Sequence, residues 1–296
     1  MGRSLALVLL FATCAARAEA PLFSRDEVIR VQWHGPWPPA RRAPARPAAA
    51  ALGERLFFDP RLSGTGSVLC ASCHVPYRAF QDGRPLGFGL AEGTRNTPSL
   101  FNVGFFRRYG WDGARASLAA QSLRPLLEAN EMRSSPARVA GLLRTLYAKD
   151  YRAAFSRAPS ASDDALFEDA GSALAAFQAT LVSGRTPFDD FRDSLRDSAG
   201  AAASRAYPLE AQAGLKLFVE RCSTCHAGPL FTSGAIVRGF RVPTLRNVAN
   251  TAPYMHDGSV ASLDEAVRHS DAALGSREAG ELVEFLKTLS ETAASH

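Results

Sequence analysis

Apolar residues recur with a helical period along several stretches of the chain. Residues 134–147 (SSPARVAGLLRTLY) place their apolar side chains on one face of a helix that Ser and Pro are suited to open. Residues 163–181 and 281–289 show the same period. Alternating strand patterns are scarce, and only 235–242 (AIVRGFRV) favours a short extended piece. The pattern predicts a mainly α fold in which these stripes form the cores.

The first twenty residues have the pattern of a secretory signal. Arg3 precedes an apolar run at 5–16 that is too short to span a bilayer, and 18–20 (AEA) fits a small-x-small cleavage site. We expect residues 1–20 to be removed and the mature chain to be exported, most simply to a bacterial periplasm. A membrane anchor is the alternative. No later stretch is apolar for long enough to span a membrane.

Composition adds two expectations. The formal net charge is +5, but Lys and Arg are spread along the chain, which argues against a nucleic-acid-binding stripe. Residues 21–51 are expected to form an N-terminal arm rich in Pro, Ala and Arg. The high proportion of Pro and Ala in 35–51 (GPWPPARRAPARPAAAA) predicts a loosely ordered tether.

All cysteines beyond the signal lie in two Cys-x-x-Cys-His motifs, CASCH at 70–74 and CSTCH at 222–226. Two disulfides or a zinc site are the alternatives. The His that directly follows each second Cys argues against both, because this is the attachment pattern of c-type haem. The sequence therefore predicts two covalently bound c-type haems. The attaching and axial residues would be Cys70, Cys73 and His74 for one haem, and Cys222, Cys225 and His226 for the other.

The two motifs lie in repeated surroundings, which indicates an internal duplication. The matching pairs are LGERLFF (52–58) with AGLKLFV (213–219), TPSLFNV (97–103) with VPTLRNV (242–248), and YGWDGARASL (109–118) with YMHDGSVASL (254–263). The last two pairs share a constant offset of 145. We therefore expect two tandem c-type-cytochrome-like haem domains, at 52–200 and 201–296. A helical stretch near 134–200 is expected to wrap between them.

Over roughly residues 50–290 the chain resembles the bacterial di-haem cytochrome c peroxidase family. The resemblance is greatest to its methylamine-utilisation branch, whose enzyme builds a tryptophan tryptophylquinone cofactor in a partner protein. It is carried by LFFDPRLSGTGSVLCASCH, RNTPSLFNV, WDGARASLAAQSLRPLLEANEM, CSTCHAGPLFT and LRNVANTAPYMHDGSVASLDEAV.

The resemblance implies that the haem at His74 reacts with peroxide. Family peroxidases carry a capping His in the following loop, but 83–96 (GRPLGFGLAEGTRN) has none, so this iron is expected to be five-coordinate. Gln121 and Glu131 match the distal residues that orient peroxide and move its proton. Trp111 matches the aromatic residue between the two haems; a packed interface Trp is the other interpretation.

The resemblance also implies an inter-domain calcium ion. Its ligands would be the side-chain oxygen of Asn96 and the backbone carbonyls of Thr251 and Pro253, an all-oxygen set that suits Ca²⁺. From the residues alone, an Asn before Thr-Pro is equally an ordinary turn residue.

The second haem, at His226, corresponds to the electron-transfer haem of the family. Its sixth ligand is usually Met or Tyr, whereas this chain has Ser270 at that position. His269 is the first candidate, an open or water-bound iron is the second, and Met255 is the third. A solvated His269 is an alternative of equal standing.

Three functions follow. The favoured one is a peroxide-dependent oxidase that takes electrons from an exported partner protein, modifying Trp or Tyr side chains through high-valent iron at an open haem. The second is a cytochrome c peroxidase that reduces hydrogen peroxide with electrons from a small cytochrome or cupredoxin. The third is a non-catalytic electron carrier, against which Gln121 and Glu131 count.

Overall fold

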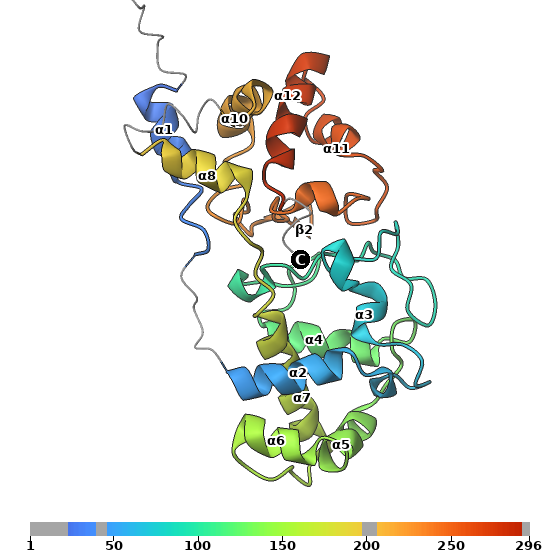
Figure 1. Cartoon of the computed structure of the whole chain (residues 1–296). Helices are drawn as coiled ribbons and strands as arrows, with labels where there is room; N and C mark the ends of the chain where they lie inside the picture. Colours follow the sequence, from blue (N-terminus) through green and yellow to red (C-terminus); the bar gives the residue numbers. More distant parts are fainter. Residues whose placement is uncertain (1–22, 40–45, 197–205, 292–296) are drawn as a thin grey trace, which may run out of the picture.

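The computed structural model describes residues 23–39, 46–196 and 206–291, which fold into two helical units stacked end to end (Figure 1). Within these residues the fold is mainly helical, and the strands form a single two-stranded sheet. The predicted mainly α class is therefore confirmed. None of the described helices combines the length and apolar character needed to cross a membrane.

Each unit has its own buried apolar cluster. The first cluster draws its members from the chain between Leu52 and Phe177. The second runs from Phe188 to Leu289 and is completed by two residues from the N-terminal segment, Phe23 and Val31. The described part of the chain therefore starts on the C-terminal unit at Phe23, builds the N-terminal unit from residue 46 onward, and joins the C-terminal unit again at α8.

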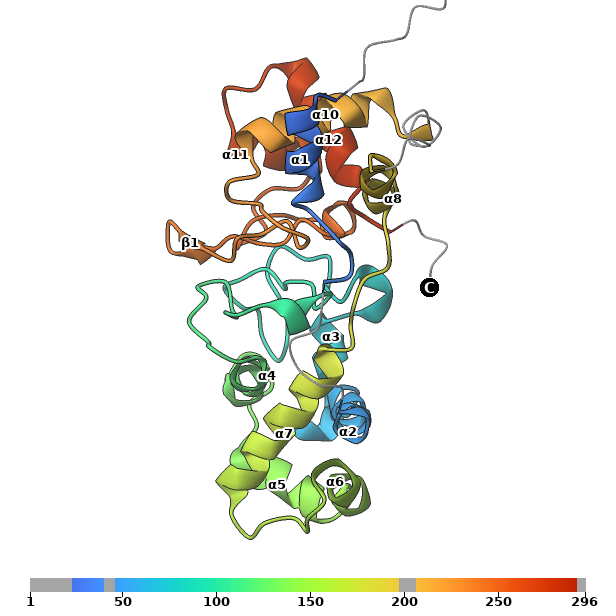
Figure 2. The ribbon, with the colours of Figure 1, turned by 90° about the vertical axis from the view of Figure 1, so that its left-hand side faces the viewer.

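The N-terminal unit is built around the crossing of α2 and α7 (Figure 2). Its α-helices are α2 (Pro47–Phe57), α3 (Cys70–Cys73), α4 (Leu118–Leu127), α5 (Pro136–Arg144), α6 (Ala148–Phe155) and α7 (Asp163–Gln178). Its 3-10 turns are η1 (Pro60–Leu62), η2 (Pro76–Arg78) and η3 (Val103–Phe105). The helical stripes predicted in 134–147 and 163–181 correspond to α5 and α7.

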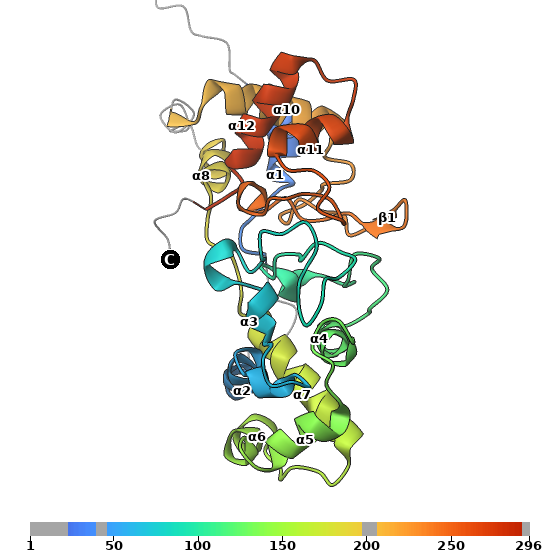
Figure 3. The same ribbon diagram turned by 90° about the vertical axis from the view of Figure 1, so that its right-hand side faces the viewer.

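The C-terminal unit is built around the crossing of α10 and α12. Its helices and strands are α1 (Arg25–Gln32), α8 (Pro187–Ser194), α10 (Leu209–Arg221), β1 (Ile236–Val237), β2 (Phe240–Arg241), η4 (Val248–Asn250), α11 (Leu263–Ser270) and α12 (Ser276–Lys287). The two strands pair antiparallel and form a hairpin that projects from the side of the molecule (Figure 3). The extended piece predicted at 235–242 is this hairpin.

Both units repeat the same local geometry at the offset of 145. An antiparallel bridge joins Tyr109 to Arg115 in the first unit and Tyr254 to Val260 in the second. After each bridge a Ser caps a helix, Ser117 for α4 and Ser262 for α11, because its hydroxyl accepts a hydrogen bond from a first-turn backbone N–H. The duplication seen in the sequence is therefore also present in the backbone.

In each unit two helices cross so closely that a glycine at the crossing has no room for a side chain. A Cβ added to Gly53 of α2 would lie 2.0 Å from the carbonyl oxygen of Ala173 in α7. A Cβ added to Gly214 of α10 would lie 1.9 Å from the carbonyl oxygen of Glu281 in α12. Such close contact holds the helix before each Cys-x-x-Cys-His motif against the last helix of its unit.

The N-terminal arm differs from its expectation. A loosely ordered tether is predicted over 35–51, but Trp37 is buried and residues 47–51 form the start of α2. Pro47 at the first helical position and the alanines after it explain this helix, since both favour helix formation there. The prediction is wrong for these residues. The predicted signal peptide, 1–20, lies outside the described residues, as do 40–45.

The helices expected to wrap between the units lie elsewhere. α5 and α6 occupy the end of the N-terminal unit farthest from the second unit, where they pack on α7 and α2 (Figures 1 and 2). Their apolar stripes are buried against these helices, so none remains to cover the junction. α8 joins the second cluster through Phe188 and Phe191, although the N-terminal domain is predicted to extend to residue 200.

Candidate functional site

The first Cys-x-x-Cys-His motif forms α3, a single helical turn. Its cysteines, Cys70 and Cys73, are free thiols. Burial raises the pKa of Cys70 to about 12 and that of Cys73 to about 11, which keeps both protonated at neutral pH. Among the described residues, no group of three or more His, Cys, Asp or Glu side chains is placed to hold a metal ion.

The imidazole that follows α3 is held by the backbone. His74 Nδ1 lies 3.0 Å from the carbonyl oxygen of Phe80. Burial lowers the pKa of His74, and the Phe80 carbonyl opposes this shift, so the ring is a neutral Nδ1–H donor. A donor bond at Nδ1 fixes the ring and leaves Nε2 for a metal, which is how axial histidines are usually oriented.

The second motif repeats this arrangement. His226 Nδ1 lies 3.0 Å from the carbonyl oxygen of Phe231, and burial again lowers the imidazole pKa. Both Cys222 and Cys225 are free thiols, and Cys225 is exposed. The donor set and the free Nε2 of both histidines therefore fit a c-type haem in each unit.

The predicted distal residues lie on α4 and in the segment that follows it. Gln121, on α4, has a buried side-chain oxygen with no hydrogen-bond partner among the described residues. Glu131 lies close enough to the motif for its charge to raise the pKa of both Cys70 and Cys73. An unpaired buried oxygen is costly, so the oxygen of Gln121 indicates space for a hydrogen-bonding ligand.

Burial also sets the protonation of Glu131. It raises the pKa of this carboxyl group above its usual value, and the cation of Arg124 offsets only part of that rise. The Arg124 Nη1 atom lies 3.4 Å from Glu131 Oε1, and Arg124 Nη2 lies 3.3 Å from Glu128 Oε1. Glu131 can therefore accept and release a proton more readily near neutral pH than an exposed glutamate can.

The loop 83–96, which contains no His, runs along the backbone of the segment that contains Glu131. The N–H groups of Leu90 and Ala91 donate to the carbonyl oxygens of Glu131 (3.0 Å) and Asn130 (2.9 Å). Gly89 fits there only because it has no side chain, since a Cβ would lie 2.6 Å from the Glu131 carbonyl oxygen. These contacts tie the loop to the residue predicted to handle the peroxide proton.

Trp111 joins the two units. Its indole Nε1 donates to the backbone carbonyl of Asn96 at 2.8 Å, and its own carbonyl accepts from the Arg241 backbone N–H at 2.7 Å. The Asn96 N–H in turn donates to the carbonyl of His256 at 2.9 Å. Trp111 and His256 occupy equivalent positions in the repeat, and both bind Asn96.

The segments predicted to hold calcium are joined by hydrogen bonds across the contact of the two units. Asn96 is buried, and its Nδ2 donates to the Arg84 carbonyl at 2.8 Å, which leaves Oδ1 for another partner. Gln81 Nε2 donates to the carbonyl of Ala252 at 3.2 Å, which anchors the segment containing Thr251 and Pro253. Calcium itself stays a prediction.

The candidate sixth ligands lie at the end of α11. The hydroxyl of Ser270 donates to the Ala266 carbonyl at 2.8 Å, so it is engaged with its own helix. Ala266 and Val267 are buried, while His269 is exposed on the neighbouring face. Met255 adopts a positive φ of 72° in the repeated turn. His269 as a ligand stays a prediction.

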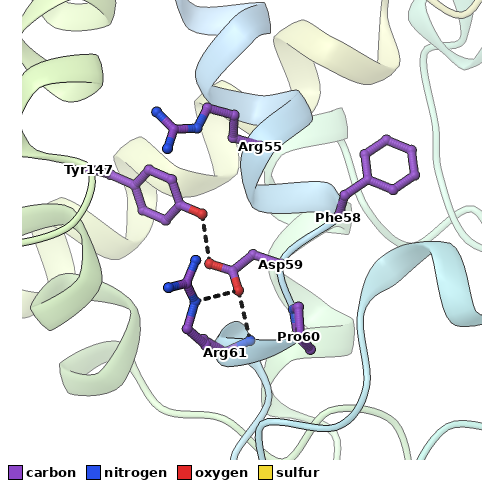
Figure 4. Close-up of a pocket in the computed structure, with 6 residues that line it drawn as sticks. All are labelled: Arg55, Phe58, Asp59, Pro60, Arg61 and Tyr147. Carbon is purple, nitrogen blue, oxygen red and sulfur yellow. Dashed lines mark hydrogen bonds and ion pairs between the residues drawn. The ribbon is translucent and has the colours of Figure 1, made fainter.

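A separate pocket lies in the N-terminal unit, and none of the predicted site residues lines it (Figure 4). It has a volume of about 460 Å³ and is lined by Arg55, Phe58, Asp59, Pro60, Arg61 and Tyr147. Its polar groups satisfy one another: Tyr147 donates to Asp59 Oδ2 at 2.6 Å, and Arg61 Nε donates to Asp59 Oδ1 at 2.8 Å. The polar side chains that line this pocket therefore form a structural ion pair with one another rather than a site for a ligand.

Sequence reasoning missed a buried ionic cluster behind the second motif. Asp189 accepts from Arg246 at 2.8 and 2.9 Å and from Arg192 at 3.0 Å, with all three side chains fully buried. The Trp37 ring lies 3.7 Å from the Arg246 guanidinium, and His34 lies nearby. These residues are separated by up to about two hundred positions, so no local pattern could bring them together.

Comparison with known proteins places this frame in a family. A profile of the di-haem cytochrome c peroxidase family matches residues 47–197. The methylamine utilization protein MauG of Methylorubrum extorquens is 33% identical, over 94% of this chain and 89% of that protein. Cytochrome c551 peroxidase of Pseudomonas aeruginosa is 32% identical, over 96% and 90%. A solved MauG-like protein associated with microbial copper homeostasis has a TM-score of 0.72 at 28% identity, covering 89% of this chain and 97% of that one.

Two Cys-x-x-Cys-His motifs in a duplicated helical frame define a di-haem c-type protein. The chain belongs to the di-haem cytochrome c peroxidase family. It is therefore a di-haem enzyme of the peroxidase kind, and the expected family is confirmed. A purely electron-carrying role is not retained, since the relatives named above are enzymes of this family.

Proposed function

We propose that this chain uses hydrogen peroxide to oxidise a partner protein, with Trp or Tyr side chains of that partner as the sites of modification. One observation carries the proposal: the charge of Glu131 reaches both cysteines of a motif whose following loop, 83–96, contains no histidine. The buried oxygen of Gln121, which has no partner among the described residues, adds support. A resting enzyme with an available first site does not need prior reduction to bind peroxide.

The first haem would be attached to Cys70 and Cys73 with His74 as axial ligand, and the second to Cys222 and Cys225 with His226. When bound, the two haems supply the redox chemistry that cleaves the peroxide O–O bond and carries electrons between the sites. We propose that the unit ending at α7 is the N-terminal haem domain and that the unit from α8 onward is the C-terminal haem domain.

The protein groups around the first site have separate tasks. The Gln121 amide orients hydrogen peroxide, because it can both donate and accept a hydrogen bond. Glu131 takes the proton from the inner peroxide oxygen and delivers it to the outer oxygen, which leaves as water. Its raised pKa suits this exchange, since the carboxyl group must hold the proton briefly and then release it.

Other residues connect the two sites. Trp111 would lie on the route of electrons between the haems, supported by its bonds to Asn96 and Arg241 at the contact of the units. Asn96, Thr251 and Pro253 would hold one Ca²⁺ ion at the same contact. His269 is the proposed sixth ligand of the second iron, reached by a local shift at the end of α11.

A cytochrome c peroxidase is the second candidate. It is favoured by the 32% identity to cytochrome c551 peroxidase of Pseudomonas aeruginosa, close to the 33% identity to MauG. In that case a small cytochrome or cupredoxin would supply the electrons. Rapid turnover of peroxide with a reduced small cytochrome would favour this candidate, and slow turnover would favour oxidation of a dedicated partner.

The test of the first site uses the ferric protein without any reductant. One equivalent of hydrogen peroxide should change the haem absorption spectrum within the mixing time of a stopped-flow instrument. Glu131→Gln should slow this change at least tenfold while both haems remain attached. Glu128→Gln is the matched control, because Glu128 shares Arg124 but carries no proposed role. No reaction in the unaltered protein would refute the proposal.

We also propose that residues 1–20 are a signal peptide and that the mature enzyme works in the periplasm. The attachment of c-type haem outside the bacterial cytoplasm supports this location. The amino-terminal sequence of the mature protein, recovered from a periplasmic extract, should begin near residue 21.

A further inference from the structure

The N-terminal segment 23–39 presents one face to the protein and another to solvent. Ser24 caps α1 with a capping box, and Val31 is fully buried against the second unit. One helical turn apart on the outer face, Ile29 is 46% exposed and Trp33 is 69% exposed. An indole ring this open offers a large apolar surface to a partner protein.

The residue after this indole lies deep in the structure. His34 is buried, and its ring stacks on Phe231 with centroids 4.6 Å apart and planes 14° apart. Its Nδ1 lies 3.1 Å from the carbonyl oxygen of Gly228. Burial and, to a lesser degree, the cations of Arg246 and Arg192 lower the pKa of His34 to about 4 against the opposing hydrogen bond to Gly228, so the ring is a neutral donor to Gly228.

The stacked partner touches the second haem motif directly. The carbonyl oxygen of Phe231 accepts from His226 Nδ1 at 3.0 Å. A continuous series of contacts therefore runs from the exposed Trp33 through the adjacent peptide bond to His34, across the ring stack to Phe231, and on to His226. Electron transfer is faster through bonded and closely stacked groups than across gaps of the same length.

The surface around Trp33 has a distinct charge. Arg25 and Arg30 are exposed on α1, and neither side chain has an ion-pair partner among the described residues. Glu27 of the same helix pairs with Lys216, so Asp26 is the acidic group left beside the two exposed arginines, and the rim keeps a net positive charge. The full chain also carries a formal charge of +5. An apolar centre with a basic rim fits a protein whose contact patch has acidic edges.

We propose that Trp33 is the contact through which an acidic redox partner protein passes electrons to the second haem. This proposal rests on the proposed function, because peroxide at the first site is the oxidant. Each hydrogen peroxide takes two electrons and two protons and gives two waters. The partner supplies these two electrons one at a time through Trp33, His34 and Phe231. Its own side chains therefore lose two electrons for each hydrogen peroxide reduced.

The electron route is tested without any partner. A ruthenium photosensitiser attached to Trp33→Cys in the holoenzyme injects an electron on a laser flash, and the second haem reports its arrival. Leu209→Cys, 68% exposed on the same unit, carries the label as control. We expect injection from position 33 to be at least tenfold faster. Equal or slower injection from position 33 would overturn the route.

The stacked ring is tested in the same labelled protein. His34→Leu removes the ring and should slow injection from position 33 at least fivefold, whereas His34→Phe keeps the stack and should retain the rate. If His34→Leu does not fold, a His34→Phe rate below one fifth of the parent rate would itself refute a route through stacked rings. An unchanged rate in His34→Leu would refute it as well.

The docking surface is tested with a reduced c-type cytochrome of acidic pI as probe. It should reduce the second haem at a rate that falls at least fivefold in Trp33→Ala and in the double variant Arg25→Glu/Arg30→Glu, but not in Leu209→Ala. Equal rates in all variants, or no reduction of the unaltered enzyme, would overturn the proposed surface. The one-equivalent peroxide reaction is measured beside it, so a failure of the first site is seen separately.

Discussion

The indole Nε1 of Trp111 donates a hydrogen bond to the backbone carbonyl of Asn96 at 2.8 Å. Trp111 belongs to the segment before α4, and Asn96 ends the loop that follows the first haem motif. The Asn96 N–H extends this link to His256 in the second unit. One residue therefore connects the proposed electron route, the proposed calcium site and the contact between units.

Trp111→Phe should lower the free energy of unfolding by about 1 kcal/mol, because the carbonyl of Asn96 loses its donor in a largely buried place. Urea unfolding followed by circular dichroism would measure the change. Trp33→Phe is the matched control, since that exposed indole should be replaceable within about 0.5 kcal/mol. An equal response of the two variants would show that the bond contributes nothing measurable.

Asp189→Asn should destabilise the C-terminal unit by about 3 kcal/mol, because the buried guanidinium group of Arg246 would lose its counter-charge and that of Arg192 would keep only Asp193 among the described residues. Asp190→Asn is the neighbouring control. Asp190 is 72% exposed and, among the described residues, forms its ion pair with Arg185, so its loss should cost less than about 0.5 kcal/mol. Thermal unfolding of both variants at neutral pH gives the comparison.

The same cluster predicts a pH dependence. Burial alone would raise the pKa of Asp189, but hydrogen bonds and charge from Arg246 outweigh it and hold the pKa below its usual value. A depressed folded pKa means that this stabilisation is present above the unfolded value near 4 and is lost as pH falls through the lower folded value. Asp189→Asn should therefore unfold with a weaker acid dependence than the parent. Parallel acid-unfolding curves would contradict this assignment.

The sequence predicts the repeated parts of this molecule well because each is set by a local pattern. The bridge between Tyr254 and Val260 and the serine cap of α11 follow from the same residues that form their counterparts 145 positions earlier. Helical class, duplication and family could all be inferred from such patterns. The candidate distal residues came from the family resemblance, since nothing local distinguishes Glu131 from a solvated carboxylate.

Contacts between distant segments could not be inferred in this way. The burial of Trp37 depends on Arg246, which lies in the other half of the chain, and a Pro/Ala/Arg-rich composition gives no sign of that partner. α8 is separated by little sequence from α7 yet packs on the other unit, because Phe188 and Phe191 find their neighbours there. Local periodicity identifies an apolar face but not the surface that covers it.

The raised pKa of Glu131 predicts the pH dependence of the peroxide reaction. Because the ionised carboxylate is the proton acceptor, the rate should rise with pH through a value above the usual range for Glu. Glu131→Gln should flatten this limb, and Glu128→Gln should retain it. Stopped-flow rates between pH 4 and pH 8 would check this, and an unaltered limb in Glu131→Gln would assign it to another group.

The same residue should trade stability for activity. A folded pKa above the unfolded value means that the contribution of Glu131 is fully present below the unfolded pKa and is lost as pH rises through the folded pKa. At neutral pH the carboxylate, whose side chain is 36% exposed and therefore partly screened by solvent, is a small burden on folding, and Glu131→Gln should unfold at a slightly higher temperature than the parent. A lower melting temperature at pH 7 would contradict the direction of this shift.

Gly53→Ala and Gly214→Ala should each destabilise the unit that contains them, because the new Cβ meets the backbone of the crossing helix at about 2 Å. Overpacking of this kind costs about 1–3 kcal/mol, which exceeds the gain of up to about 1 kcal/mol from replacing Gly by Ala within a helix. Gly280→Ala is the control in α12, since no atom lies within 4 Å of its Cβ, and it should be neutral or stabilising. Thermal unfolding of the three variants, followed by circular dichroism, should therefore separate Gly280→Ala from the other two. If all three variants are equally stable, the helix crossings before the two Cys-x-x-Cys-His motifs are looser than these contacts imply.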